Sequence, residues 1–192
     1  MHVDIGRIRD HVAALAASPR PAESPALDDA RAYVARKLQQ AGWEVEPLAF
    51  QVEAGERGLL RGVNLFAHHP AHPLGNGPRF CVGAHLDSIP TSPGADDNAS
   101  AVATLLEVAR LLPENWPAEA QVELQLAAYD LEECGMLGGA EHARLIQQAG
   151  VDLRGMISLE MLGYCDPEPG SQLLPSVLAG MYPDTGDFIA LI

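Results

Sequence analysis

The sequence has 192 residues, 47% of them hydrophobic, and its 12 Lys and Arg against 26 Asp and Glu give a formal net charge of −14. This length and composition predict one globular domain with enough chain to bury a core. Because no basic cluster is present, the charge argues against nucleic acid and anionic membrane surfaces as partners.

In chain order, the first part of the sequence predicts two amphipathic helices and a pair of strands. Apolar residues at helical spacing predict helices over residues 5–16 and 26–42. Two strands are predicted at 43–52 and 59–69, joined by a turn around Gly55.

The rest of the sequence alternates predicted strands with predicted helices. Strands are expected at 79–84, 122–129 and 154–162, and helices at 100–112 and 136–150. This alternation predicts an α/β fold, a three-layer sandwich whose mixed, mostly parallel central sheet is flanked by helices. We expect residues 1–192 to form a single domain.

One histidine and several carboxylates follow the ends of these strands or lie in the loops after them. In chain order they are His85, Asp87, Asp96, Asp97, Glu132, Glu133 and Glu160. In open α/β sheets, ligands bind in the crevice beyond the carboxyl ends of the strands. We therefore expect these side chains to meet at one edge of the sheet.

The residue types at this edge predict a metal site. Imidazole nitrogen and carboxylate oxygens are common zinc ligands, and His85 supplies the nitrogen. Asp87 is within reach of the other ring nitrogen and is expected to fix the tautomer. An aspartate of the loop can bridge two metals, which together would polarise a carbonyl and activate a water. Of Glu132 and Glu133, one is expected to ligate and the other to act as general base.

Each motif alone also has an ordinary structural interpretation, as a turn, a helix cap or a solvated loop. Their joint occurrence, in order and at strand ends, favours the metal site. Among the other histidines, His68, His69 and His72 are expected in a solvent-facing turn, with a second metal patch as the alternative. We expect surface positions on or beside helices for His2, His11 and His142.

The motifs "GAHLDS", "PGADDNAS", Glu-Glu-x-Gly-x-x-Gly and "SLEMLGY" closely resemble metallopeptidase family twenty-eight, which includes bacterial leucyl aminopeptidases, glutamate carboxypeptidase II and glutaminyl cyclases. The resemblance implies a first zinc bound by His85, Asp97 and Glu160. It implies that Asp97 bridges to a second zinc, which Glu133 also binds. Asp97 is preferred to Asp96 because the family motif places the ligand directly before the asparagine.

The resemblance also implies catalytic roles, with Glu132 as the general base and Asp87 behind the histidine ligand. The last zinc ligand of the family is a downstream histidine, and this sequence has none after His142. The sequence stops at Ile192 inside the apolar run "FIALI", which reads as a strand entering a core. We therefore expect a domain without its C-terminal portion, holding one zinc where the family holds two.

The expected function is that of a zinc metallo-exopeptidase of the aminopeptidase type, hydrolysing N-terminal peptide bonds of a peptide substrate through a di-zinc-activated water. Two alternatives stay open: a glutaminyl-cyclase-like acyltransferase, and a catalytically inactive truncated relative that serves as a binding module. The three cysteines form no Cys-x-x-Cys pair, and the N-terminus has no signal-peptide pattern, so we expect a cytoplasmic protein.

Overall fold

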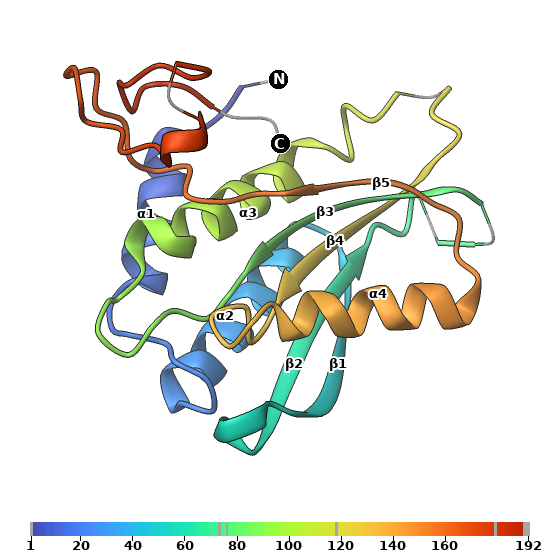
Figure 1. The fold of residues 1–192 in the computed structure, drawn as a ribbon. Helices are drawn as coiled ribbons and strands as arrows, with labels where there is room; N and C mark the ends of the chain where they lie inside the picture. The colour runs from blue at the N-terminus through green and yellow to red at the C-terminus, as the bar shows by residue number, and fades with distance from the viewer. Residues whose placement is uncertain (1, 73, 76, 118, 179, 190–192) are drawn as a thin grey trace.

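In the computed structural model, which describes residues 2–72, 74–75, 77–117, 119–178 and 180–189, two helices and a strand hairpin come first, and strands then alternate with helices from residue 79 to residue 158 (Figure 1). The strands are β1 (Glu44–Glu53), β2 (Leu59–His68), β3 (Arg79–His85), β4 (Glu123–Tyr129) and β5 (Leu153–Ser158). The helices are α1 (Ile5–Leu15), α2 (Pro25–Gln40), α3 (Ala101–Leu111) and α4 (Leu137–Ala149). Short helical segments are η1 (Gly55–Arg57), η2 (Ala95–Ser100) and η3 (Ser176–Leu178). Every helix and strand expected between residues 5 and 158 is therefore present.

The five described strands form one sheet in the order β1-β2-β4-β3-β5. The β1–β2 hairpin pairs antiparallel within itself and antiparallel to β4. Strand β3 lies between β4 and β5 and is parallel to both. The predicted α/β class with a mixed sheet is confirmed. Parallel and antiparallel pairs are equal in number, instead of mostly parallel, because the hairpin continues the sheet antiparallel beyond β4.

Helices cover both faces of the sheet, so the three-layer arrangement is as predicted (Figure 1). Successive side chains of a strand point to opposite faces. Val82 and Ala84 of β3 pack into the large core formed with α1, α2 and α3, whereas Cys81 belongs to a smaller cluster on the other face. There, the ring of His142 from α4 lies 4.4 Å from the ring of Phe66. Burial of β3 and β4 on both faces explains the near-continuous apolar runs in their sequences.

The chain after β5 has little regular structure, apart from η3 and a single bridge between Asp166 and Gly186. The strand expected in "FIALI" is not formed at Phe188 and Ile189, and residues 190–192 lie outside the described part. Ile189 is exposed and pairs with no described strand. None of the described helices is both long and apolar enough to cross a bilayer.

The surface positions expected for His11 and His142 are wrong, because both rings are buried. Nδ1 of His11 lies 2.7 Å from the hydroxyl of Tyr33, and Nδ1 of His142 lies 2.8 Å from that of Tyr129. Each histidine is on the inner face of its helix, where a tyrosine hydroxyl is the hydrogen-bond partner of its ring nitrogen. Burial, followed by the charge of Arg79, lowers the pKa of His142 to about 4, so this ring is neutral at physiological pH.

The turn with His68, His69 and His72 is partly buried and not fully solvent-facing. The ring of His69 lies edge-on to Trp43 at 5.5 Å, and Nε2 of His68 lies 3.1 Å from a carboxylate oxygen of Glu44. These contacts give His68 and His69 a role in packing. Among the described residues, the turn contributes to no group with metal-ligand spacing.

Candidate metal centre

The carboxyl ends of the three mutually parallel strands, β4, β3 and β5, lie at one edge of the sheet. His85 is the last residue of β3, Glu132 follows β4, and Glu160 follows β5. Asp97 is in η2, which leads into α3. Four residues separated by as much as 75 positions in the chain thus meet because strand direction brings them together, as the sequence predicted.

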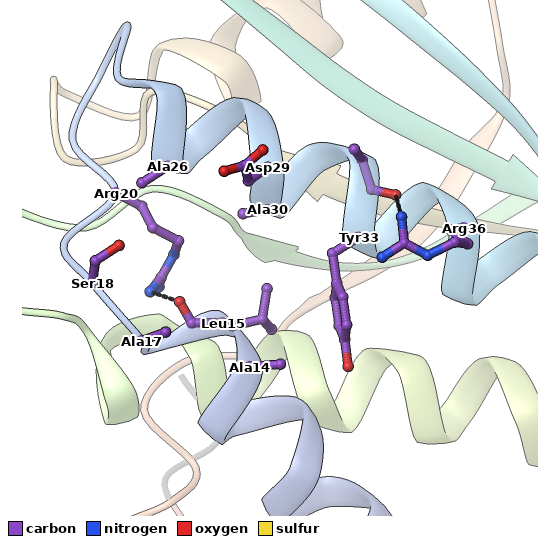
Figure 2. Close-up of a pocket in the computed structure, with 11 residues that line it drawn as sticks. Ala14, Leu15, Ala17, Ser18, Arg20, Ala26, Asp29, Ala30, Tyr33 and Arg36 are labelled. Atoms are coloured by element: carbon purple, nitrogen blue, oxygen red, sulfur yellow. Dashed lines mark hydrogen bonds between the residues drawn. The ribbon is translucent and has the colours of Figure 1, made fainter.

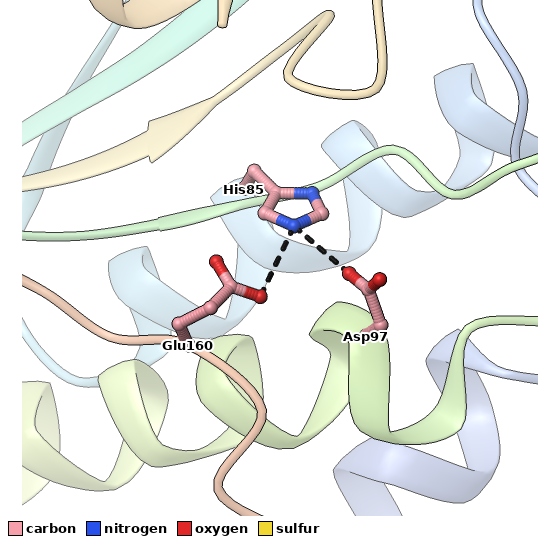
Figure 3. Close-up of side chains that lie close together, drawn as sticks. All are labelled: His85, Asp97 and Glu160. Atoms are coloured by element: carbon pink, nitrogen blue, oxygen red, sulfur yellow. Dashed lines mark ion pairs between the residues drawn. The ribbon is translucent and has the colours of Figure 1, made fainter. Parts of the chain in front are cut away.

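Nε2 of His85 is the centre of this group. It lies 3.1 Å from Oδ1 of Asp97, 3.5 Å from Oε1 of Glu160 and 3.9 Å from Oε2 of Glu132. Figure 3 shows Asp97 and Glu160 approaching the ring nitrogen from different elements, η2 and the segment after β5. The histidine side chain is only 4% exposed, whereas those of Asp97 and Glu160 are each 48% exposed. The group is therefore buried at its base and open to solvent at its carboxylates.

The donor set suits a divalent cation. One ligand atom from each of His85, Asp97 and Glu160 lies within 4.8 Å of the others. Within the described part of the chain, no lysine or arginine forms an ion pair with Asp97, Glu132 or Glu160. Repulsion between converging carboxylates is relieved by a bound cation, and this nitrogen and oxygen set is one that zinc accepts.

Asp87 is fully buried behind the group and organises it by a route that the sequence did not predict. Its two carboxylate oxygens accept hydrogen bonds from the backbone N–H groups of Glu132 and Glu133, each at 3.0 Å. Nδ1 of His85 lies 3.1 Å from the backbone carbonyl of Asp87 and 3.5 Å from its carboxylate. The tautomer expected for His85 is thus supported mainly by the carbonyl, while the carboxylate positions the Glu132–Glu133 turn.

Alternate residues of η2 have different tasks. Asp97 faces His85, whereas Asp96, Asn98 and Ser100 bind the segment of residues 159–163 that carries Glu160. Oδ1 of Asp96 accepts a hydrogen bond from the backbone N–H of Gly163 at 2.7 Å, and Oγ of Ser100 accepts one from Leu162 at 3.0 Å. Sequence reasoning missed Asn98 and Ser100, although both are inside the motif "DDNAS".

Glu133 lies beside the group without joining it. Its carboxylate is not among the atoms that lie within 4.8 Å of one another. Burial, followed by the charge of Asp97, raises the pKa of Glu133. Burial likewise raises the pKa of Glu160, against the opposite effect of the neighbouring His85. Burial is the largest cause of both pKa shifts, and the neighbouring carboxylates add to it.

Arg20 supports the loop that joins the candidate ligands His85 and Asp97, from a position that no sequence pattern indicated. It lines a cavity of about 380 Å³ between α1 and α2, and Figure 2 shows its side chain reaching the carbonyl of Leu15. The buried guanidinium also donates to the carbonyls of Leu86, Pro93 and Gly94. A single cation thereby ties the end of α1 to both ends of the loop between β3 and η2.

The pKa of His85 has a direct consequence for metal binding. Burial alone lowers it, but the hydrogen bond and charge of Asp87, with the charges of Glu160 and Glu132, outweigh burial and raise the pKa to about 9. In the metal-free chain the ring is therefore protonated at neutral pH. A metal requires the neutral imidazole, so binding must release this proton.

We expect zinc affinity to increase with pH between 6 and 8, by roughly tenfold per unit for one released proton. The sign follows from the raised pKa of His85, because the competing protonated form loses population as the pH approaches 9. Chelator competition at several pH values measures the slope. Calorimetry in two buffers of different ionisation enthalpy counts the released protons, and a pH-independent affinity without proton release would contradict this expectation.

Asp87→Asn is expected to weaken zinc binding by about 10–100-fold without abolishing it. The amide nitrogen of asparagine cannot accept a hydrogen bond, so the backbone N–H of Glu132 or Glu133 loses its partner. A matched Asp152→Asn variant changes an exposed aspartate that pairs with Arg154, and it should bind zinc normally. Equal dissociation constants for zinc in the two variants would show that Asp87 supports the Glu132–Glu133 turn without contributing to zinc binding.

The fold and the site together define an α/β domain with a carboxylate-rich candidate metal centre at the carboxyl edge of its sheet. The model of Peptidase family M28 matches residues 64–184, which include every candidate ligand and more than half of the chain. The chain belongs to this family.

Sequence relatives overlap the chain over part of their own length. It is 43% identical to the Escherichia coli protein YfbL over 131 residues, which cover 61% of this chain and 39% of YfbL. It is 34% identical to aminopeptidase YwaD of Bacillus subtilis over 100 residues, covering 52% of this chain and 21% of YwaD. The chain thus spans less than half the length of either relative.

Solved structures share the fold at lower identity. A leucine aminopeptidase precursor from Bacteroides thetaiotaomicron superposes with a TM-score of 0.73 at 23% identity, covering 85% of this chain and 64% of that one. A glutaminyl cyclase from Porphyromonas gingivalis superposes with the same TM-score of 0.73 at 21% identity, covering 87% and 62%. At these identities the likeness establishes the fold alone, which hydrolases and cyclases share.

Proposed function

We propose that this chain is the metal-binding part of a zinc-dependent exopeptidase of the aminopeptidase type, which hydrolyses the N-terminal bond of a peptide. The observation that supports it most is the convergence of Asp97, Glu160 and Glu132 on Nε2 of His85. The name of the relative aminopeptidase YwaD supports the substrate class.

In this proposal, His85, Asp97 and Glu160 hold one zinc, and Asp97 and Glu133 contribute to a second. When bound, zinc supplies a Lewis acid that polarises the scissile carbonyl and lowers the pKa of a water. The openness of Asp97 and Glu160 to solvent leaves room for a substrate.

Glu132 is the proposed general base. Its side chain is 37% exposed and Oε2 lies 3.9 Å from Nε2 of His85, so it is beside the proposed metal ligands and still faces solvent. The backbone N–H of Glu132 donates a hydrogen bond to Oδ1 of Asp87 at 3.0 Å, which fixes the backbone from which the side chain extends. A carboxylate in this position takes a proton from the attacking water and gives it to the leaving amine.

A glutaminyl-cyclase-like acyltransferase is the second candidate, because glutaminyl cyclases share the fold at a TM-score of 0.73. Hydrolysis of a leucyl anilide, measured beside cyclisation of an N-terminal glutaminyl peptide, separates the two. Zinc-dependent hydrolysis without cyclisation is expected. Cyclisation alone would favour the acyltransferase, and neither activity in a zinc-loaded chain would favour a binding module.

The purified 192-residue chain is expected to retain about one zinc per chain, since catalytic zinc normally has about three protein ligands. The first site has His85, Asp97 and Glu160, whereas the second has Asp97 and Glu133, and no histidine follows His142 in this sequence. Turnover should accordingly be slow. Metal analysis after dialysis gives the stoichiometry, and two tightly held zincs would mean that another residue completes the second site.

A further inference from the structure

Asn98 is fully buried, and within the described part of the chain its carboxamide makes hydrogen bonds only with the segment after β5. Nδ2 donates to the carbonyl of Leu159 at 3.0 Å and to Oε2 of Glu160 at 3.1 Å. Oδ1 accepts from the backbone N–H of Met161 at 3.2 Å. The side chain of one residue thus holds both the backbone and the carboxylate of this segment.

The backbone determines which end of the carboxamide faces Glu160. A carbonyl oxygen, here that of Leu159, can only accept, and the N–H of Met161 can only donate. Turning the amide over would place oxygen against oxygen and N–H against N–H. The NH₂ group of Asn98 is therefore the end that meets Oε2 of Glu160.

The two oxygens of Glu160 consequently face different groups. Oε2 is engaged by Asn98, while Oε1 lies 3.5 Å from Nε2 of His85. We propose that Asn98 is a positioning residue that makes Glu160 a single-oxygen metal ligand through Oε1. This inference rests on the proposed zinc function and adds the orientation of one ligand to it.

Single-oxygen ligation matters because a glutamate can bind a metal through one oxygen or both. A glutamate that used both oxygens would occupy an additional coordination position. Catalytic zinc sites work with an open position, which substrate or water can enter. By holding Oε2, Asn98 keeps that position free and also fixes where Oε1 points.

Ser100 offers a matched control within the same motif. Its Oγ accepts a hydrogen bond from the N–H of Leu162 at 3.0 Å, so it anchors the same segment. It makes no hydrogen bond with the carboxylate of Glu160 in the described structure. A variant of Ser100 therefore reports the effect of loosening the segment while leaving the bond to Oε2 in place.

The first experiment compares Asn98→Asp with Ser100→Ala. Asn98→Asp keeps the side-chain shape and the acceptor for Met161, but it removes the donor to the carbonyl of Leu159 and to Oε2 of Glu160 and places a second carboxylate oxygen against Oε2. We expect it to weaken zinc binding by about 10–100-fold, with a smaller effect of Ser100→Ala. The visible absorption of the cobalt-loaded chain, which depends on coordination geometry, should change in Asn98→Asp and stay unchanged in Ser100→Ala. Equal effects of the two variants on affinity and spectrum, or tighter binding by Asn98→Asp, would overturn the proposal.

A second measurement uses the unchanged chain and so does not depend on how a variant folds. A crystal structure of the zinc-loaded chain should show Oε1 of Glu160 at about 2.0–2.2 Å from the metal, with Oε2 still bonded to Asn98. Zinc bound by both oxygens would overturn the role of Asn98 while supporting the proposed function. No zinc at His85, Asp97 and Glu160 would overturn both.

Discussion

Glu132→Gln is expected to slow hydrolysis of a leucyl anilide by about 10²–10⁴-fold while leaving zinc content unchanged. Glutamine keeps the shape of the side chain and the backbone hydrogen bond to Asp87, but it cannot accept a proton. Since Glu132 is outside the group formed by His85, Asp97 and Glu160, its replacement removes no ligand of the first site. Steady-state rates at high enzyme concentration, paired with metal analysis, measure both effects.

Glu133→Gln is the matched variant, because it changes the neighbouring glutamate, which Asp87 holds in the same way. The first-site zinc should persist in it, and the loss of rate should be smaller than in Glu132→Gln. Wild-type turnover in Glu132→Gln, with the large loss in Glu133→Gln instead, would reverse the roles assigned to the two glutamates.

Asp130→Ala is expected to lower the free energy of unfolding of the metal-free chain by about 3–5 kcal/mol. Asp130 is fully buried, pairs with Arg31, and accepts hydrogen bonds from the backbone N–H groups of Val63 at 2.7 Å and Leu131 at 2.9 Å. Alanine leaves the guanidinium without its buried counter-charge and two backbone donors without acceptors. Urea denaturation followed by circular dichroism measures the change.

The control for this variant is Asp152→Ala, which breaks the exposed pair of Asp152 with Arg154. Exposed pairs contribute about 0–1 kcal/mol, so this variant should unfold almost as the unchanged chain does. Similar losses in the two variants would show that the Arg31–Asp130 pair is no more important than a surface pair. A large loss confined to Asp130→Ala would identify this residue as a main support of the turn that follows β4.

The order of helices and strands could be predicted because it depends on local patterns. The 3.6-residue periodicity of residues 101–111 and the apolar runs at 79–85 and 123–129 are readable within one segment. The edge at which the candidate residues meet was also predictable, since parallel strands end together. The antiparallel join of the hairpin to β4 was not, because strand order depends on which edges pair across the whole chain.

Histidine burial shows the same limit at the level of single residues. His11 and His142 lie in helices whose patterns were correctly predicted, yet both rings turned out to be buried. Their partners are the hydroxyls of Tyr33 and Tyr129, which other elements supply. A local pattern gives the helix but not what packs against its polar side chains.

The sequence by itself determined the class of fold, the residue types of the candidate site and their meeting at one sheet edge. Only the tertiary structure decided what each side chain does there. Asp87 reaches backbone groups 45 and 46 residues away, and Asn98 reaches the carboxylate of Glu160 62 residues away. Hydrogen bonds are short and directional, so such partners follow from atomic positions after the chain has folded and not from spacing along it.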